Sequence, residues 1–344
     1  MAAFKVQCVA CHQAGGALEP WAYEIPEEPP EGHLDVEISH CGVCGSDVHQ
    51  LENSWGVACF PLVPGHEIIG RVVHLGPGVS EFAIGQRVGI GVQRSCCGAC
   101  DCCGEGLENI CPKITKTYAG PGKDKGGFAR HIRYPANWTF AVPENFPPEL
   151  AAPLFCAGIT TFSPLKRHCR KGMKVGIIGV GGLGHIAIQY ARALGCKVVA
   201  ISTTDSKRAE AEEFGATGFI ASKDEAQMAA GKGTLNVILN TASGVAGMDD
   251  YLALLKPRGV MVCVGLPEKD VANMTKLFMH SLVLQEKSLT GSYLGPRADY
   301  ADMLAFSAEH RIAPKVEVMK FEDVNEAVER VKTGTARYRM VLSM

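Results

Sequence analysis

Four cysteines between residues 97 and 111 carry the clearest chemical signal in the chain. They are Cys97, Cys100, Cys103 and Cys111, a C-x2-C-x2-C-x7-C spacing with glycines between them. Thiolates at this spacing can turn onto one small ion, and four of them complete the tetrahedral coordination of Zn²⁺ without leaving a position for substrate. The segment therefore predicts a closed, structural zinc site.

The spacing leaves two alternatives. Cys96 and Cys102 lie in the same segment and allow other sets of four, but only the first set keeps two consecutive C-x2-C steps that share Cys100. A disulfide cluster is the other alternative, although a chain of 344 residues is far longer than the small secreted domains that need such crosslinks. The start, MAAFKVQCVACHQ, shows no signal-peptide pattern, so we expect reduced thiols and a cytoplasmic location.

Length and composition narrow the classes of protein. A chain of 344 residues predicts one to three domains, with two as the natural expectation, and 47% hydrophobic residues are enough for large cores. The formal net charge is -2 and no basic stripe appears, which argues against a nucleic-acid partner. No run of 18 apolar residues appears, so we expect no membrane span.

The character of the chain changes along its length. The first part is β-rich, with strands expected at 33–42, 67–76 and 86–93, and the Pro-rich residues 141–153 are expected to be a connection into a new unit. From about Met173, apolar strands alternate with helices, which predicts an α/β fold with a doubly wound parallel sheet. A helix is expected around residues 249–256, and after about Ser288 the chain returns to mixed structure and is expected to rejoin the first domain.

A glycine-rich turn opens this α/β part. A strand over 173–178 leads into Gly179, Gly181, Gly182, Leu183 and Gly184, and an amphipathic helix follows. The first glycine allows the tight turn, the second lets the backbone approach a pyrophosphate, and the last lets the helix pack closely on the strand. The strand, turn and helix together predict a dinucleotide site rather than an ordinary glycine turn.

The end of the next strand bears on the choice of nucleotide. It ends at Ser202, where NAD-binding sites usually carry an acid against the ribose 2′-hydroxyl. The residues that replace or follow that acid are Ser202, Thr203, Thr204, Asp205, Lys207 and Arg208. Small hydroxyl side chains and a nearby cation suit a 2′-phosphate, so we predict NADP(H) over NAD(H). Asp205 argues the other way, and the two basic residues could instead be the solvated first turn of a helix.

Three further segments carry candidate metal ligands. They contain Cys41, Cys44 and His49; His66 and Glu67; and Cys156. One Cys, one His and a second Cys make a catalytic zinc site with an exchangeable fourth position. Taken singly, each has an ordinary alternative, since Cys156 in an apolar run is typical of a buried small hydrophobe and His66 could be a turn residue.

These motifs, in this order, resemble one known family. The motifs are Cys44-Gly45-Ser46-Asp47-Val48-His49, Gly65-His66-Glu67, the four-cysteine segment, Cys156 with Thr160, and the Gly179–Gly184 turn. Together they resemble the zinc-dependent medium-chain alcohol dehydrogenases, and within them the cinnamyl alcohol dehydrogenase-like, NADP-dependent aldehyde reductases. The phrases PLFCAGIT, GSYLG and ARYRMVLSM strengthen the resemblance, which covers essentially the whole length.

The resemblance implies a domain organisation and a set of metal ligands. A discontinuous GroES-like catalytic domain, residues 1–155 and 290–344, would carry two zinc ions, and a Rossmann domain, residues 156–289, would bind NADP. Cys44, His66 and Cys156 match the catalytic zinc ligands, and Glu67 matches a residue that can approach the metal when its fourth position is exchanged. Cys41 is then not a ligand, although its C-x2-C spacing to Cys44 suggests one.

The resemblance also implies roles around the substrate. Asp47 matches an acid that orients the ligand imidazole, Ser46 the hydroxyl that bonds the substrate oxygen, and His49 the outer end of a proton relay. Thr160 would lie near the nicotinamide. The family further implies a homodimer formed through edge strands of the nucleotide domain.

The expected function is therefore an oxidoreductase that interconverts primary alcohols and aldehydes, aromatic, cinnamyl-type or medium aliphatic. Candidate walls of the substrate pocket are Trp55, Leu107, Tyr118, Tyr293 and Leu294. An NAD-dependent polyol dehydrogenase of the same superfamily is one alternative, although it commonly carries an acid where this chain has Ser202. A non-enzymatic zinc- and nucleotide-binding protein is another, against which stands the coexistence of the catalytic-type residues.

Overall fold

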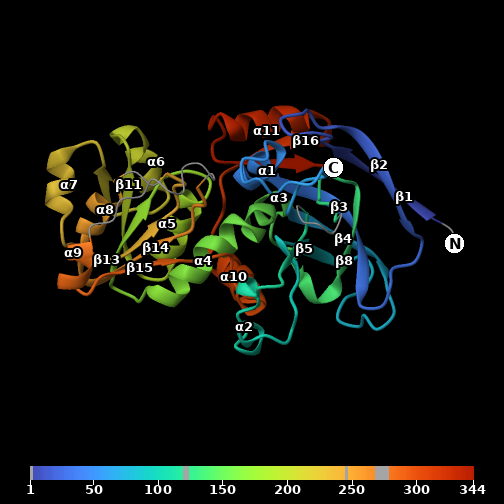
Figure 1. Ribbon diagram of the computed structural model, residues 1–344, viewed down its shortest axis with the longest axis horizontal. Coiled ribbons are helices and arrows are strands. Elements are labelled where there is room, and N and C mark those ends of the chain that lie inside the picture. Colours follow the sequence, from blue (N-terminus) through green and yellow to red (C-terminus); the bar gives the residue numbers. More distant parts are fainter. Residues whose placement is uncertain (1–2, 119–123, 245–246, 268–278) are drawn as a thin grey trace. The chain divides into compact units, whose positions relative to one another are not determined.

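The computed structural model describes residues 3–118, 124–244, 247–267 and 279–344 (Figure 1). The chain divides into two compact units. The first comprises Met1–Cys156, Pro296–Ala308 and Pro314–Met344, and the second comprises Ala157–Gly295 and Glu309–Ala313.

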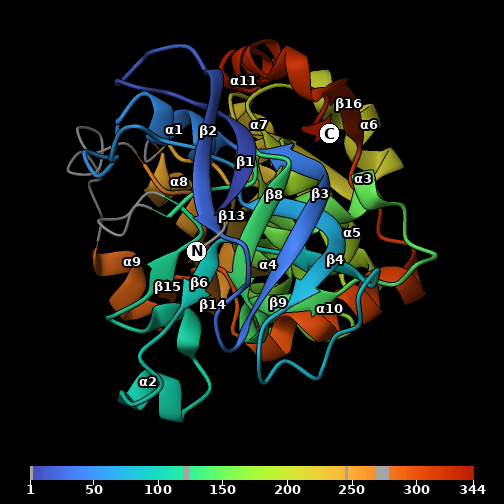
Figure 2. The same ribbon diagram turned by 90° about the vertical axis from the view of Figure 1, so that its right-hand side faces the viewer.

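The first unit is built on strands that pair antiparallel, except for the parallel pair of the last two. They are β1 (Ala3–Ala10), β2 (Glu19–Pro26), β3 (His33–Val43), β4 (Glu67–Leu75), β5 (Arg87–Ile90), β6 (Gln93–Ser95), β7 (Thr115–Lys116), β8 (His131–Pro135), β9 (Thr139–Ala141), β16 (Val316–Lys320) and β17 (Arg339–Ser343). Seven of these form one sheet in the order β16-β17-β3-β4-β5-β9, with β8 also paired to β3. Figure 2 shows β8, β3 and β4 side by side. The long central strand β3 therefore brings the chain's C-terminal strands next to its N-terminal ones.

Short helices fill the connections of the first unit. They are α1 (Gly45–Leu51), α2 (Asp101–Gly104), α3 (Pro148–Ala151) and α11 (Val324–Lys332), together with most of α10 (Arg297–His310). The Pro-rich residues 141–153, expected as a connection, are partly helical, because Pro148 and Pro153 stand in the first turns of α3 and of a 3₁₀ helix over Ala152–Phe155. Proline fits a first helical turn, where its missing N–H has no partner to lose.

The second unit is a parallel sheet with helices between its strands. The strands are β10 (Lys174–Ile178), β11 (Lys197–Ser202), β12 (Gly218–Ala221), β13 (Leu235–Asn240), β14 (Leu255–Cys263) and β15 (Ser288–Gly291). The helices are α4 (Ala157–His168), α5 (Gly184–Ala193), α6 (Arg208–Glu213), α7 (Glu225–Gly231), α8 (Met248–Ala253) and α9 (Met279–Leu284). The sheet order is β12-β11-β10-β13-β14-β15, which is the 3-2-1-4-5-6 order of dinucleotide-binding sheets. The predicted α/β class with a doubly wound parallel sheet is confirmed.

Two boundaries differ from the sequence expectation. The helix expected over 249–256 ends at Ala253, because Leu255 and Lys256 already belong to β14. The expected domain limit between residues 289 and 290 falls inside β15, which pairs with β14, so the compact second unit continues to Gly295. The predicted GroES-like and Rossmann domain limits stay a prediction as limits of independently folding domains.

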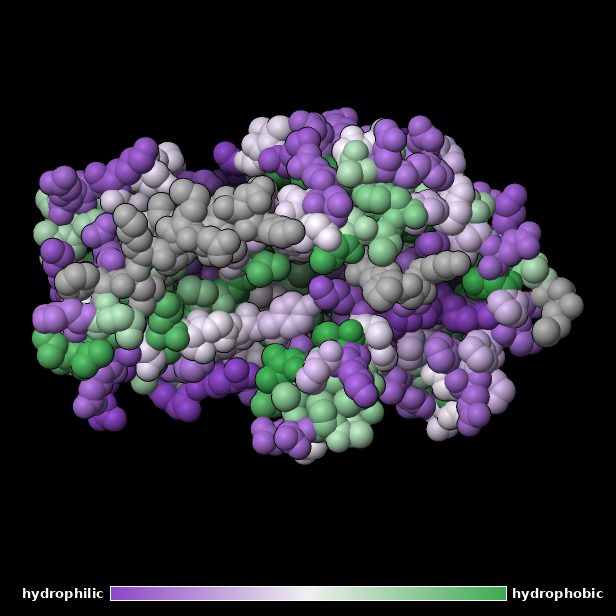
Figure 3. All heavy atoms as spheres, viewed as in Figure 1, coloured by the Kyte–Doolittle hydropathy of each residue, from purple (hydrophilic) through white to green (hydrophobic). Residues whose placement is uncertain are grey.

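The surface of the second unit carries apolar side chains on α9. Met279, Val283 and Leu284 are 60, 68 and 67% exposed. Figure 3 shows hydrophobic surface at the lower left, where Figure 1 labels α9. None of the helices in the described part of the chain is both long and apolar enough to span a bilayer.

Candidate metal centres and nucleotide site

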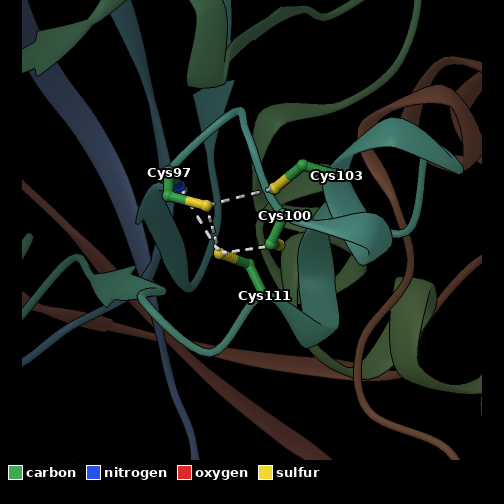
Figure 4. Close-up of side chains that lie close together, drawn as sticks. All are labelled: Cys97, Cys100, Cys103 and Cys111. Atoms are coloured by element: carbon green, nitrogen blue, oxygen red, sulfur yellow. Dashed lines mark hydrogen bonds between the residues drawn. The ribbon is translucent and has the colours of Figure 1, made fainter.

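The four cysteines that were predicted to bind the structural zinc, called the lobe cysteines below, converge around one point. The sulfurs of Cys97, Cys100, Cys103 and Cys111 all lie within 4.8 Å of one another (Figure 4). The Sγ of Cys111 lies 3.5 Å from that of Cys97 and 3.8 Å from that of Cys100, and the Cys97–Cys103 separation is 4.0 Å. Four thiolates bound 2.3 Å from one tetrahedral zinc stand about 3.8 Å apart, so the spacing of these sulfurs fits that ion.

Local structure explains this convergence. Cys100 caps the short helix α2, and Cys111 follows a 3₁₀ helix over Glu108–Ile110. The backbone N–H groups of Cys97 and Lys113 lie 3.4 and 3.3 Å from the Cys111 sulfur, as donors to a thiolate would. A backbone hydrogen bond from Ala99, and then the Cys111 thiol, lower the pKa of Cys97 to about 6. Cys97 thus favours the thiolate form that binds metal, whereas burial raises the pKa of the Cys103 thiol.

The alternatives for these cysteines can now be compared. Cys96 and Cys102 lie in the same segment, but neither is a member of the convergent set. Every cysteine of the described residues carries a free thiol, and sulfurs 3.5–4.0 Å apart are well beyond the length of about 2.05 Å of a disulfide bond. The geometry therefore favours the predicted set of four.

A second cluster of possible metal ligands belongs to the first unit. One ligand atom from each of Cys44, His66, Glu67 and Cys156 lies within 4.8 Å of the others, and all four residues are buried. Cys44 follows β3 and is the N-cap residue of α1, His66 immediately precedes β4, and Cys156 follows the 3₁₀ helix after α3. The two sulfurs are 3.8 Å apart, and a hydrogen bond from the Cys156 thiol lowers the pKa of Cys44. The fold thus brings together residues that are more than a hundred positions apart in sequence.

Asp47 organises the imidazole of this cluster. The carboxylate is completely buried and accepts hydrogen bonds from the backbone N–H of Cys44 at 2.8 Å and of Gly65 at 2.9 Å. It also lies 3.3 Å from Nδ1 of His66. Burial lowers the pKa of His66, but the Asp47 charge and hydrogen bond outweigh it, so the pKa is raised.

The other imidazole nitrogen is left for a ligand. With Nδ1 on Asp47, the buried Nε2 of His66 has no hydrogen-bond partner among the described residues. A buried nitrogen without a partner beside two thiols fits a metal ion, because zinc prefers nitrogen and sulfur ligands and a carboxylate on the far nitrogen fixes the tautomer.

Glu67 forms a buried ion pair that the sequence did not suggest. Its Oε1 accepts a hydrogen bond from Nη2 of Arg339 on β17, and both residues are buried. Its Oε2 is also buried and has no partner in the described part of the protein. Burial raises the pKa of Glu67 to about 7, although the Arg339 guanidinium pulls it down.

The two residues predicted to relay a proton, Ser46 and His49, lie close to Cys44 in sequence, as does Cys41, which was not expected to bind the metal. The Cys44 thiol lies 3.7 Å from the Ser46 hydroxyl. His49 bonds the Ser54 hydroxyl through Nδ1 at 2.9 Å and stacks on Trp55 with ring centroids 4.7 Å apart. Cys41 points elsewhere, since its thiol donates to its neighbour's carbonyl, that of Gly42, at 3.6 Å, and it is not part of the cluster.

Tyr118 was expected as a pocket wall, and the structure gives it another place. Its side chain is 5% exposed, and its hydroxyl donates to Oδ1 of Asp47. Its ring stacks on that of His66, with centroids 5.7 Å apart. The contact joins positions 71 residues apart, which no local pattern signals.

The glycine-rich turn lies at the centre of the parallel sheet. It joins β10 to α5, and β10 has β11 on one side and β13 on the other, where the strand order reverses. Gly179 has φ +87°, and a Cβ at Gly184 would overlap the Gly179 carbonyl, so both positions require glycine. A Cβ at Gly181 would meet no atom, which leaves room for a ligand over the turn. This arrangement fits a bound pyrophosphate.

The residues after β11 separate into two groups. Lys207 reaches back to the turn and donates from Nζ to the Val180 carbonyl at 2.7 Å. Arg208 instead donates from Nε to Asp205 at 3.0 Å and stacks over the Phe219 ring. Ser202 ends β11, and Thr203 and Thr204 follow it, with the Thr204 hydroxyl 3.0 Å from that of Ser206.

Thr160, which was expected near the nicotinamide, lies on α4 and is 9% exposed.

Comparison with known proteins places these features in context. Residues 30–144 match the family model described as an alcohol dehydrogenase GroES-like domain, and residues 182–309 match that described as a zinc-binding dehydrogenase. Cinnamyl alcohol dehydrogenase 8 of Arabidopsis thaliana is 38% identical over 98% of this chain and 94% of its own length. Mannitol dehydrogenase of Petroselinum crispum is 42% identical over 91% of this chain and 94% of its own length. A solved structure of CAD from Helicobacter pylori, complexed with NADP(H), is 32% identical, with a TM-score of 0.91 over 100% of this chain and 99% of that one.

Proposed function

Because this chain belongs to the zinc-dependent medium-chain alcohol dehydrogenases, we propose that it is an NADP(H)-dependent aldehyde reductase that interconverts aldehydes and primary alcohols. The substrates we propose are small aromatic, cinnamyl-type and medium aliphatic compounds. The observation that carries the proposal is the buried convergence of Cys44, His66 and Cys156 with a free imidazole nitrogen.

Two zinc ions per chain are part of the proposal. Cys44 Sγ, His66 Nε2 and Cys156 Sγ would hold the catalytic ion, and the four lobe cysteines would hold the structural one. At the catalytic centre, zinc would supply Lewis-acid chemistry to the substrate oxygen. The Asp47 carboxylate accepts a hydrogen bond from the N–H at Nδ1 of His66. It therefore keeps the imidazole in the tautomer in which Nε2 carries no proton and can bind a metal.

Ser46 and His49 are proposed to move the proton. They are three positions apart on α1 and therefore lie on the same face of the helix. The Ser46 hydroxyl would bond the substrate oxygen and exchange its proton, while His49, held by Ser54 and Trp55, would pass the proton outward. Glu67, with one buried oxygen unpaired, would approach the metal when its fourth position is exchanged.

The residues that follow β11 support the choice of NADP(H) over NAD(H). Asp205, the one acid that could serve a ribose 2′-hydroxyl, is already engaged by Arg208. Ser202, Thr203 and Thr204 leave room and hydroxyl groups, and Lys207 at the turn supplies a cation for a 2′-phosphate. The nucleotide would supply the hydride chemistry, and Thr160 is proposed to line the nicotinamide position.

A polyol dehydrogenase is the second candidate. The similarity to a mannitol dehydrogenase favours it, and it would use the same zinc ligands. Against an NAD-dependent form stands Ser202 at the end of β11, where an acid would be expected.

Steady-state kinetics test the proposal. Purified protein is assayed with NADPH and with NADH against cinnamaldehyde, benzaldehyde and hexanal, and in reverse with the matching alcohols and mannitol. The proposal predicts reduction of the aldehydes with a higher kcat/KM for NADPH. Preference for NADH with mannitol as the best alcohol would favour the second candidate, and zinc-loaded protein with no turnover on any carbonyl would favour a binding protein.

A further inference from the structure

Tyr118 makes contacts that the proposed mechanism does not use. We infer that it is a positioning residue of the Cys44–His66–Cys156 centre, which holds the His66 imidazole by a hydrogen bond to Asp47 and by ring stacking. The inference rests on the proposed function, since it concerns the same centre.

One carboxylate oxygen connects the residues involved. Oδ1 of Asp47 accepts from the Tyr118 hydroxyl, from the backbone N–H of Gly65 at 2.9 Å and lies 3.3 Å from Nδ1 of His66. The Tyr118 and His66 rings are stacked at an interplanar angle of 27°. Tyr118 therefore contacts both members of the Asp47–His66 pair, one through its hydroxyl and the other through its ring.

The chemistry of these groups gives the hydroxyl a defined direction. An ionised carboxylate only accepts hydrogen bonds, so the Tyr118 hydroxyl must donate. Asp47 is completely buried, and its donors decide where its two oxygens lie. Since Oδ1 also receives the imidazole N–H, removing the tyrosine donor lets the carboxylate and the imidazole shift together. Partners beyond the metal ligands typically change metal affinity or activity by about 10- to 100-fold when they are lost.

The backbone before Tyr118 holds it in place. Thr117 donates from its backbone N–H to the Val92 carbonyl at 2.8 Å, and its hydroxyl lies 2.6 Å from that of Tyr134. The segment between Cys111 and Tyr118 also pairs with β6 through β7. Tyr118 is thus anchored independently of the metal centre, as a group that positions another must be.

Tyr134 provides a matched control. It is a fully buried tyrosine of the same unit, and its hydroxyl donates to the Gln93 carbonyl at 2.8 Å. It is not a member of the metal-ligating cluster, and none of its hydrogen bonds goes to Asp47 or His66. Tyr134→Phe therefore removes a comparable buried hydroxyl that contacts neither Asp47 nor His66. It also removes the contact with the Thr117 hydroxyl, but it leaves the backbone bond from Thr117 to Val92, which anchors the residue next to Tyr118.

The test compares Tyr118→Phe with Tyr134→Phe in zinc-loaded protein. The readouts are the rate at which each zinc is lost to a chelator, the visible absorption spectrum of protein with Co²⁺ in the Cys44 centre, and kcat and KM with NADPH and benzaldehyde. We expect Tyr118→Phe to lose one of its two zinc ions about tenfold faster, to shift the Co²⁺ bands and to lower kcat more than it raises KM. Tyr134→Phe should leave the spectrum and the zinc-loss rate as in the wild type, even where its melting temperature falls as far.

The outcomes separate two failures. A wild type that holds two zinc ions, with a Tyr118→Phe variant that has the wild-type spectrum and zinc-loss rate, overturns the inference alone. Equal spectral shifts in both variants also overturn it, because they would reflect general loosening. A wild type that holds zinc in the lobe only overturns the proposed function, and the inference with it.

Discussion

Among single residues, the buried ion pair of Glu67 and Arg339 allows a direct test of how a partner stabilises a buried charge. Arg339→Met leaves the Glu67 carboxylate buried without its guanidinium partner, and losses of this kind cost about 3–5 kcal/mol of the free energy of unfolding. The double variant Glu67→Gln/Arg339→Met should recover most of that loss, because no unpaired charge remains. Urea denaturation of zinc-loaded protein measures both.

The control for this pair is an ion pair on the surface. Arg71 and Glu144 are 47 and 61% exposed, so Arg71→Met should change the unfolding midpoint little. An Arg339→Met variant as stable as Arg71→Met would mean that Glu67 does not depend on its buried partner.

Cofactor preference is also decided by single side chains. Lys207→Ala removes the cation placed at the glycine turn, and we expect the KM for NADPH to rise about tenfold while that for NADH stays the same, since only the phosphate charge is lost. Arg208→Ala is the matched control, because Arg208 is engaged by Asp205. An equal effect on both cofactors, or a larger effect at Arg208, would contradict the assignment.

Residue types and local spacing predicted the set of four cysteines, and they gave Cys41, Cys44, His66 and Cys156 as candidates for the second cluster. The choice of Cys44 over Cys41 and the place of Glu67 came from the family pattern. Residue types and spacing could not predict the partners of Asp47 and Glu67. Tyr118 and Arg339 reach them across 71 and 272 positions, and such contacts depend on strand order and register, which single motifs do not encode.

At the scale of elements, the cysteine lobe allows a sharp comparison of neighbours. Cys100→Ala removes one of the four convergent sulfurs, whereas Cys102→Ala removes a thiol of the same helix α2 that lies outside the set. We expect Cys100→Ala to lose one zinc per chain and to melt at a clearly lower temperature, because a structural zinc contributes directly to folding. Cys102→Ala should keep its zinc and its melting temperature. If Cys102→Ala instead lost the zinc and the stability while Cys100→Ala kept both, the zinc would be bound by a set of cysteines that includes Cys102.

The turn between β10 and α5 allows a second comparison. Gly184→Ala would force a Cβ into the Gly179 carbonyl, so the strand and helix must separate, and both stability and dinucleotide binding should fall. At Gly181 the same change meets no atom of the protein, so the melting temperature should hold while NADPH and NADH bind more weakly. Calorimetry and fluorescence titration measure the two effects. Unchanged cofactor affinity in Gly181→Ala would place the pyrophosphate elsewhere.

Element types were predictable where periodicity was strong, as in β10, α5 and β11. Predictions missed where local composition and tertiary pairing disagree. Residues 255 and 256 continue a helical pattern but are drawn into β14 by pairing with β13, and the Pro-rich residues 148–155 form helical turns because their prolines stand at first positions.

At the scale of the whole molecule, the family accounts for the order of the parts, a GroES-like region followed by a dinucleotide-binding sheet. The homodimer that the family implies stays a prediction. β15 is one of the two edge strands of the parallel sheet, and α9 exposes apolar side chains, as an association surface would. The cytoplasmic location also stays a prediction.

The most direct test of the central claim is the zinc content of fully active protein and of Cys156→Ala, measured by elemental analysis beside NADPH-dependent reduction of benzaldehyde. The account predicts two zinc ions per chain in the wild type, and one in Cys156→Ala, which should fold and keep the lobe ion but show no turnover. A wild type that is fully active with a single zinc held by the four lobe cysteines would contradict the account.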